Sequence, residues 1–331
     1  MATLRDLRKR LKAVNNTQKI TKAMKMIAAS KLRRAQQAIL QARPYALRMQ
    51  EVLGHVVSRA EVESHPLLAV RPPRKVQLVV MTSNRGLCGG FNSTILRSAE
   101  RFIAENRPHL EELQVSTIGR KARDHFRRKG ISIQQSWENV WEQLEFERAV
   151  EIANDLAARF KSGELDAVYL LYNEFKSAIS QNQTIMQLLP IQPIEDWMER
   201  QAKIGELAAI SGNAEASQGA VRPLVMPTQK SGWQPQTASE QEAYGYEHLF
   251  EPSRQEVLEA LLPQHLAIQI WRALLESNAA LYGAQMSAMD AASRNAKELF
   301  GKLTIKANRV RQASITTELM EIVSGAESLK G

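Results

Sequence analysis

The sequence is poor in cysteine and in long apolar runs, and each shortage excludes a class of protein. Cys88 is the single cysteine among 331 residues, so no disulfide can form within the chain and nothing indicates an oxidising compartment. No run of about 18 apolar residues occurs, so we expect no membrane-spanning helix. The start of the chain lacks the continuous apolar segment of a signal peptide. Its Arg-rich amphipathic pattern continues well past Leu40, which indicates that it belongs to the mature protein.

Residues that break helices are scarce at both ends of the chain. Residues 3–53 contain no glycine and only one proline, Pro44, and no proline occurs from residue 264 onward. At 1.5 Å per residue, the two tracts of about 3–58 and 264–328 would form rods on the order of 80–100 Å long. Coiled-coil spacing occurs in both tracts, at Leu4, Leu7, Leu11 and Val14, and at Leu303, Ala307, Val310, Ser314 and Thr317. We therefore expect two long helices that pair antiparallel as a shaft.

Local signals set the expected ends of these helices. Thr3 followed by Asp6 predicts a capping box at the start of the first helix. Pro44 is expected to kink this helix without necessarily ending it. Pro263 is expected to separate a short helix from the long final one.

The middle of the chain alternates between strand-like and helix-like segments. The expected strands are Lys75–Thr82, Gln114–Gly119, Ile131–Gln135, Ala167–Asn173 and Thr184–Leu189. The expected helices are Asn92–Asn106, Arg120–Arg128 and Phe146–Lys161. This alternation predicts a mostly parallel sheet covered by helices, and hence an α/β fold with a long coiled coil.

Four segments follow from these patterns. We expect an N-terminal coiled-coil helix over residues 1–70, a central α/β domain over 75–195 and a C-terminal coiled-coil helix over 246–331. Within residues 196–245, the stretches Ser211–Gly219 and Ser231–Ser239 are poor in large apolar side chains, and three prolines punctuate the range, which predicts an insertion or a mobile loop.

The positive charge is concentrated at the start of the chain. Residues 1–43 carry 12 Lys and Arg against one acid, Asp6, and are therefore +11. The whole chain is +9, so the remainder is −2. A basic stripe of this kind predicts an acidic partner: nucleic acid, a membrane surface or acidic protein loops. Because apolar residues keep seam spacing among the charges, the basic outer face of a coiled coil is the simpler interpretation.

Four features are candidates for chemical or binding sites. Asn84–Asn92 follows a strand and opens a helix, which suits anion binding, but it matches no phosphate-binding pattern, and a tight turn is favoured. Cys88 lies near that helix start without a histidine nearby in sequence, so a structural thiol is favoured over a nucleophile. The six histidines show no metal spacing, and we expect no metal and no cofactor. Arg309, Arg311 and Gln312 form either a solvated face or, with the N-terminal basic segment, a surface that holds a partner.

Three segments also carry a resemblance to a known family. Asn16–Arg34 (NTQKITKAMKMIAASKLRR), Arg85–Asn92 (RGLCGGFN) and Ala307–Ala326 (ANRVRQASITTELMEIVSGA) resemble the N-terminal, central and C-terminal signatures of the gamma subunits of F-type ATP synthases. The resemblance covers residues 1–195 and 246–331. It implies an antiparallel coiled coil formed by the terminal helices, with a central α/β domain packed against its lower part.

The resemblance also implies the function. The chain would be the central rotor stalk that couples ion-driven rotation of the c-ring to conformational change at the beta-subunit catalytic sites, and it would itself be non-catalytic. Its partners would be the alpha and beta subunits, the epsilon subunit and the c-ring, with no nucleic acid. Membrane association would come only through the complex, at the cytoplasmic face of the bacterial inner membrane.

The resemblance further assigns partner-binding residues. Arg311 and Gln312 match the family's polar catch to beta-subunit loops, with Thr316 nearby, and Met24 and Lys25 occupy the facing position on the N-terminal helix. The insertion at 196–245 resembles in place one that suppresses ATP hydrolysis in photosynthetic gamma subunits. The lack of a cysteine pair excludes thiol switching, so a brake by another route is the hypothesis here.

Two other functions would fit part of the sequence. A basic coiled-coil protein that binds nucleic acid would show steeply salt-dependent binding, but it leaves the C-terminal signature unexplained. A phosphate-binding α/β enzyme would bind its ligand at Gly86–Gly90, and it makes both rods superfluous.

Overall fold

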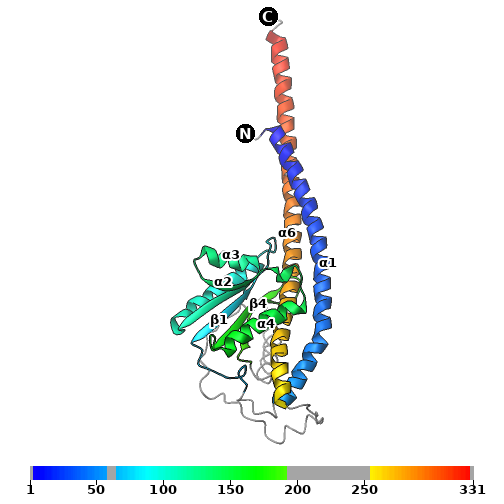
Figure 1. Ribbon diagram of the computed structural model, residues 1–331. Helices are drawn as coiled ribbons and strands as arrows, with labels where there is room; N and C mark the ends of the chain where they lie inside the picture. The colour runs from blue at the N-terminus through cyan, green and yellow to red at the C-terminus, as the bar shows by residue number, and fades with distance from the viewer. Residues whose placement is uncertain (1–2, 58–64, 192–253, 329–331) are drawn as a thin grey trace, which may run out of the picture. The chain divides into compact units, whose positions relative to one another are not determined.

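A computed structural model describes residues 3–57, 65–191 and 254–328 (Figure 1). The expected insertion at 196–245 lies outside these residues. The chain divides into two compact units: Met1–Ser30 with Gln285–Gly331, and Lys31–Ala284. We call them the coiled-coil unit and the α/β unit, and each is described by itself.

Two long helices account for the ends of the chain. Helix α1 spans Leu4–Val57 and helix α6 spans Arg254–Ser328, with 54 and 75 residues. The capping box is confirmed, because the Asp6 N–H donates to Thr3 Oγ1 at 3.3 Å and the Thr3 N–H donates to Asp6 Oδ2 at 3.4 Å. Pro44 lies inside α1, which continues past it as expected.

The expectation for Pro263 was wrong. Helix α6 runs through this proline without a break. A proline inside a helix costs roughly 3 kcal/mol. The neighbouring Leu262 and Leu266 are fully buried in the core of the α/β unit, and this burial outweighs the local preference.

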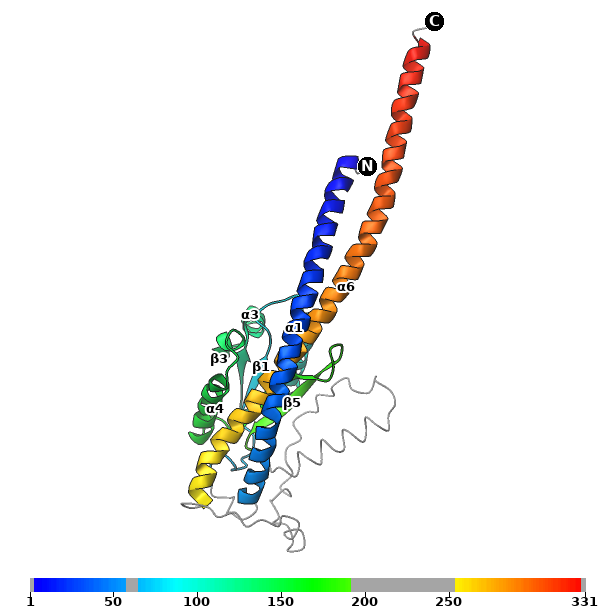
Figure 2. The ribbon, with the colours of Figure 1, turned by 90° about the vertical axis from the view of Figure 1, so that its right-hand side faces the viewer.

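In the coiled-coil unit, the first part of α1 and the last part of α6 run antiparallel and side by side (Figures 1 and 2). The seam between them buries Leu7, Thr21, Ala28, Met289, Ala296 and Ala307. Small alanine side chains in the seam allow the two backbones to approach closely. The antiparallel coiled coil is thus confirmed.

The seam ends earlier than the spacing predicted. Ala307 is its last buried position, and residues 311–325 are exposed throughout, Ser314 and Thr317 included. The reason is that α1 begins at Leu4 and offers no partner to this stretch, which extends past the start of α1 (Figure 2).

The α/β unit contains a five-stranded sheet in the order β3-β2-β1-β4-β5. The strands are β1 Lys75–Met81, β2 Glu112–Ile118, β3 Ile133–Trp137, β4 Ala167–Phe175 and β5 Gln181–Leu189. The first four are parallel to their neighbours and β5 is antiparallel to β4. The mostly parallel sheet is therefore confirmed.

Helices cover both faces of this sheet. They are α2 Phe91–Asn106, α3 Arg120–Arg128 and α4 Phe146–Lys161, with short 3₁₀ turns η2 Arg107–His109 and η3 Asn139–Trp141. Alternate residues of β1 enter two cores: Leu78 and Val80 pack with α2 and α3, whereas Val79 and Met81 pack with α4 and α6. The sheet is thereby fastened directly to α6.

Candidate partner-binding surface

The glycine-rich segment after β1 forms a turn that packs on α6. Asn92 Oδ1 accepts a hydrogen bond from the Ser83 N–H at 3.0 Å, which closes the turn at the start of α2. Cys88 and Phe91 are buried against Ala280 and Ala284 of α6. These contacts show that the glycine-rich segment serves as a strand-to-helix turn.

Cys88 has the environment of a structural thiol. Its side chain is 2% exposed, and burial raises the pKa of its thiol. A raised thiol pKa lowers the fraction of reactive thiolate at neutral pH.

We therefore expect Cys88 to resist alkylation in the folded chain. Iodoacetamide at neutral pH should modify Cys88 in the folded chain at least about tenfold more slowly than it modifies Cys88 in the chain unfolded by denaturant. Both thiolate formation and access of the reagent are hindered in the folded chain. Mass spectrometry of a time course measures the rate. Equal rates in the two conditions would contradict a buried, structural Cys88.

The described ranges hold neither a cluster suited to a metal nor a spanning helix. Within them, no group of three His, Cys, Asp or Glu side chains lies together in a way that could hold a metal ion. His125 bonds to Glu100 at 2.6 Å, and burial lowers the pKa of His265 to about 4. No described helix is long and apolar enough to cross a membrane.

The exposed end of α6 carries three of the residues assigned by resemblance. Arg311, Gln312 and Thr316 all face solvent, and the Thr316 hydroxyl donates to the Gln312 carbonyl at 2.9 Å. Helical spacing places Gln312 and Thr316 on one face, with Arg311 beside them. These side chains are available to a partner.

Apolar side chains surround this polar group, and our sequence analysis missed them. They are Ile315, Leu319, Met320, Ile322 and Val323, each at least half exposed. An exposed apolar patch of this kind marks an interaction surface. The sequence signal that could have found them is the run of apolar residues that continues along α6 beyond the part that α1 covers.

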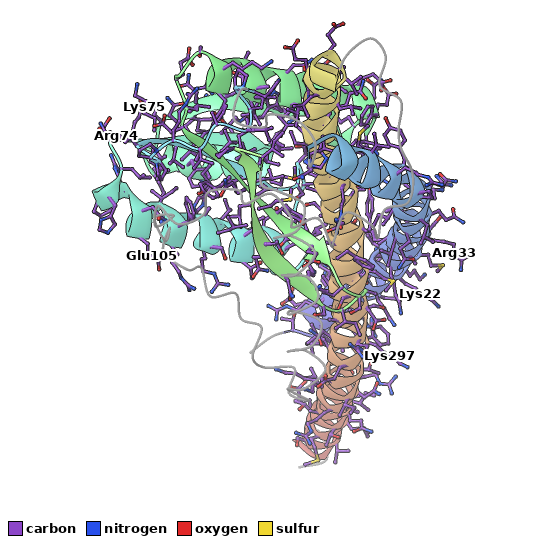
Figure 3. All side chains as sticks on the ribbon, turned by 90° about the horizontal axis from the view of Figure 1, so that it is seen from below. Lys22, Arg33, Arg74, Lys75, Glu105 and Lys297 are labelled. Atoms are coloured by element: carbon purple, nitrogen blue, oxygen red, sulfur yellow. The ribbon has the colours of Figure 1, made fainter. Side chains whose placement is uncertain are left out.

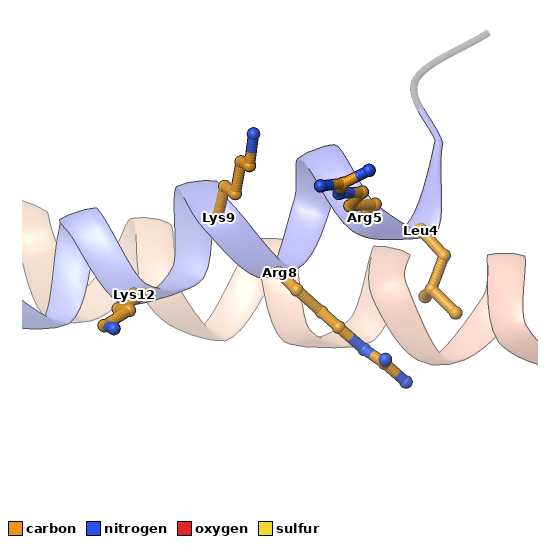
Figure 4. A pocket seen from close by; sticks show the side chains of 5 residues that line it. All are labelled: Leu4, Arg5, Arg8, Lys9 and Lys12. Carbon is orange, nitrogen blue, oxygen red and sulfur yellow. The ribbon is translucent and has the colours of Figure 1, made fainter.

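The start of α1 lies at the same level of the coiled coil. Leu4, Arg5, Arg8, Lys9 and Lys12 line an open hollow of about 490 Å³, and Figure 4 shows their side chains spread around the helix. The Lys25–Asp290 contact shows the register of the antiparallel pair, and Leu4 and Arg311 each lie 21 residues from it. We call Leu4–Lys12 with Arg311–Thr316 the distal surface. It is strongly positive.

Met24 and Lys25 lie at a different level. Lys25 Nζ contacts Asp290 Oδ1 at 2.5 Å, and this hydrogen bond lowers the pKa of the Asp290 carboxyl. Met24 is half-buried beside it. Asp290 is separated from Arg311 by about 30 Å of helix. The structure therefore does not bring Met24 and Lys25 together with Arg311 and Gln312.

The rest of the basic stripe faces outward. Lys22 and Arg33 project from the outer side of α1 into solvent (Figure 3). In the α/β unit, Lys31 Nζ instead lies over the Tyr282 ring of α6, 5.3 Å from its centroid. The positive charge thus borders the apolar seam rather than interrupting it.

Comparisons with known proteins identify the family. A family model described as ATP synthase matches residues 3–329. The ATP synthase gamma chain of Anaeromyxobacter sp. (strain Fw109-5) is 46% identical over 333 residues, and that of Geobacter metallireducens is 44% identical over 331 residues; each alignment covers 100% of both chains.

Solved structures agree with this assignment. The central stalk and c-ring structure of the Tetrahymena thermophila mitochondrial ATP synthase contains a chain 25% identical to this one, with a TM-score of 0.55, covering 83% of this chain and 99% of that one. A chain in the F1/c-ring structure of the Euglena gracilis mitochondrial ATP synthase shares the fold, with 19% identity and a TM-score of 0.63. The match covers 98% of this chain and 94% of that one. The chain belongs to the ATP synthase gamma-chain family.

Proposed function

We propose that this chain is the rotor shaft of an F-type ATP synthase. It couples ion-driven rotation of the c-ring to conformational change at catalytic sites in the beta subunits, and it is itself non-catalytic. The observation that carries the proposal is the bare end of α6, where residues 311–325 are exposed and mix polar and apolar side chains. A surface of this kind is suited to a surrounding partner. Family membership gives no support to the nucleic-acid alternative.

The mechanism is one of unequal contacts. A shaft can shift the equilibrium of a neighbouring site only if it binds that site's conformations with different affinity. The exposed end of α6 is uneven, since Leu319 lies in the same sector as Gln312, which is seven residues before it, whereas Thr317 lies on the opposite side of the helix. Each orientation of the shaft therefore presents different chemistry to each of the alpha and beta subunits around it.

The parts of the chain divide this work. In this proposal the helices of residues 1–70 and 246–331 form the shaft, and residues 75–195 form the domain that meets the epsilon subunit and the c-ring. The complex holds the chain peripherally at the cytoplasmic face of the bacterial inner membrane. Residues 196–245 act as a brake on hydrolysis in this scheme, which stays a prediction.

Co-expression with the matching alpha and beta subunits tests the function. The proposal predicts a stable complex with one copy of this chain per three alpha–beta pairs, and ATP hydrolysis that depends on its presence. Gel filtration and an ATPase assay measure both. Failure to assemble, together with salt-sensitive binding to nucleic acid, would favour the rejected alternative.

The ion pair at Lys25 gives a more local prediction. Its side chains are 44% and 34% exposed, so a Lys25→Ala and Asp290→Ala double-mutant cycle should show only weak coupling between the two residues in thermal unfolding. If Lys25 also binds a partner, Lys25→Ala will lower ATPase activity in the complex while Asp290→Ala will not. Equal losses in the two variants would show that Lys25 acts through the ion pair alone.

A further inference from the structure

Helices α1 and α6 leave a second open hollow between them within the α/β unit. Its volume is about 270 Å³. On α1 it is lined by Lys31, Arg34, Ala35 and Ala38, which recur at three- and four-residue spacing along one face of the helix. All of its lining residues belong to the α/β unit, so this hollow is separate from the distal surface. We call it the α1–α6 hollow.

The hollow exists because two positions of α1 carry alanine. Across from them, α6 presents Trp271, Leu275 and Asn278 at the same helical spacing. Facing side chains of two paired helices normally interlock as knobs and holes. Ala35 and Ala38 are too short to fill the space in front of these residues, and an opening remains.

The floor of the α1–α6 hollow is apolar and firmly packed. Ala35 and Leu275 are only 4% and 3% exposed. Leu144, from the segment before α4, lines one side and packs against the core of the α/β unit. The Trp271 ring meets the Phe146 ring edge to face, with centroids 6.1 Å apart, which holds its orientation. A hollow with an apolar floor and few polar groups is typical of a site for a small molecule.

The rim of the hollow carries two positive charges. Lys31 Nζ lies 5.3 Å from the centroid of the Tyr282 ring, and Arg34 is exposed about one turn further along α1. Among the residues that the structure describes, neither cation forms an ion pair with a carboxylate. Both charges are therefore available to a ligand, and a guanidinium can bind a carboxylate through two parallel hydrogen bonds. Asn278 adds an amide group that can donate or accept a hydrogen bond.

We propose that the α1–α6 hollow binds a small amphipathic carboxylate. The carboxylate group lies between Lys31 and Arg34, and an aromatic or branched hydrocarbon body covers Ala38 and Leu275. A volume of about 270 Å³ is at the small end of ligand pockets, which suits a molecule of one or two rings. The bound molecule contacts α1 and α6 together, so it stabilises the folded α/β unit. This binding does not depend on the proposed rotor function.

The test is a titration of the full-length chain with 2-naphthoate, and with uncharged 2-naphthamide for comparison. Calorimetry measures the dissociation constants, and circular dichroism follows the thermal unfolding of each variant. Arg34→Gln removes one charge of the rim, and Ala38→Leu fills the hollow while both charges stay. The matched control is Arg33→Gln, which removes the same charge from a neighbouring residue that projects from the outer side of α1 into solvent (Figure 3).

We expect 2-naphthoate to bind the wild-type chain with a dissociation constant below about 1 mM and to raise its unfolding temperature. Arg34→Gln should weaken binding about tenfold, Ala38→Leu should weaken it at least as much, and Arg33→Gln should change it less than about twofold. The uncharged amide should bind at least about tenfold more weakly than the carboxylate. The proposal would be overturned by no binding to the wild-type chain, by full binding to Ala38→Leu, by equal losses in Arg34→Gln and Arg33→Gln, or by equal affinity for the amide.

Discussion

Replacing Arg311 and Gln312 together by alanine is expected to lower ATP hydrolysis and coupled synthesis of the assembled complex about tenfold. Both side chains are exposed on the part of α6 that α1 does not cover, so the chain itself does not use them for packing. A hydrogen bond to a charged group contributes about 1.5–3 kcal/mol, and about 1.4 kcal/mol in a barrier is tenfold in rate. Steady-state hydrolysis and synthesis assays measure the effect.

Arg309→Ala is the matched control for this prediction. It removes the same charge at nearly the same level of α6. Arg309 precedes Arg311 by two residues, so its side chain lies about 200° around the helix from that of Arg311. We expect its effect to be much smaller. If the double variant were fully active, or if Arg309→Ala caused an equal loss, the assignment of Arg311 and Gln312 as a directional contact would be wrong.

Gly119→Ala is expected to lower the stability of the chain by about 3 kcal/mol or more, from left-handed strain together with overpacking. Gly119 has a φ of +96°, and an added Cβ would lie 2.1 Å from the Thr82 carbonyl oxygen. The Thr82 N–H donates to the Ile118 carbonyl at 2.8 Å and the Gly119 N–H to the Trp137 carbonyl at 3.0 Å, so neither backbone can move away. Chemical unfolding of the full chain measures the loss.

Two other glycines separate the causes of this loss. Gly163 has a φ of +81° but open space around its Cβ position, so Gly163→Ala should cost only about 1–2 kcal/mol from strain. Gly86 has neither a positive φ nor a close neighbour, and Gly86→Ala should change stability by less than about 0.5 kcal/mol. If all three variants were equally stable, the close approach at Gly119 would not be needed by the fold.

Much of the architecture could be predicted from the sequence because the helices and strands follow strong local patterns. The predicted helix Arg120–Arg128 is reproduced to the residue, and the strand predicted at Lys75–Thr82 ends one residue earlier. The prediction for Pro263 was wrong because the cost of a proline to a helix is local. The side-chain burial that outweighs this cost involves segments distant in the sequence. The predicted coiled-coil seam of α6 ran too far because the spacing of its apolar residues carries no information about where the partner helix begins.

The site was less predictable than the fold. The motif match assigned Arg311 and Gln312, and the structure adds the exposed apolar patch around them.

Rotation of this chain inside the complex tests the central claim most directly. A Cys88→Ser variant carrying Arg107→Cys on the exposed turn η2 offers a single accessible thiol for a bead, with the catalytic subunits fixed to a surface. We predict that ATP drives continuous rotation of the bead in one direction and that rotation stops when ATP is removed. ATP hydrolysis at the normal rate with a stationary bead would contradict the account.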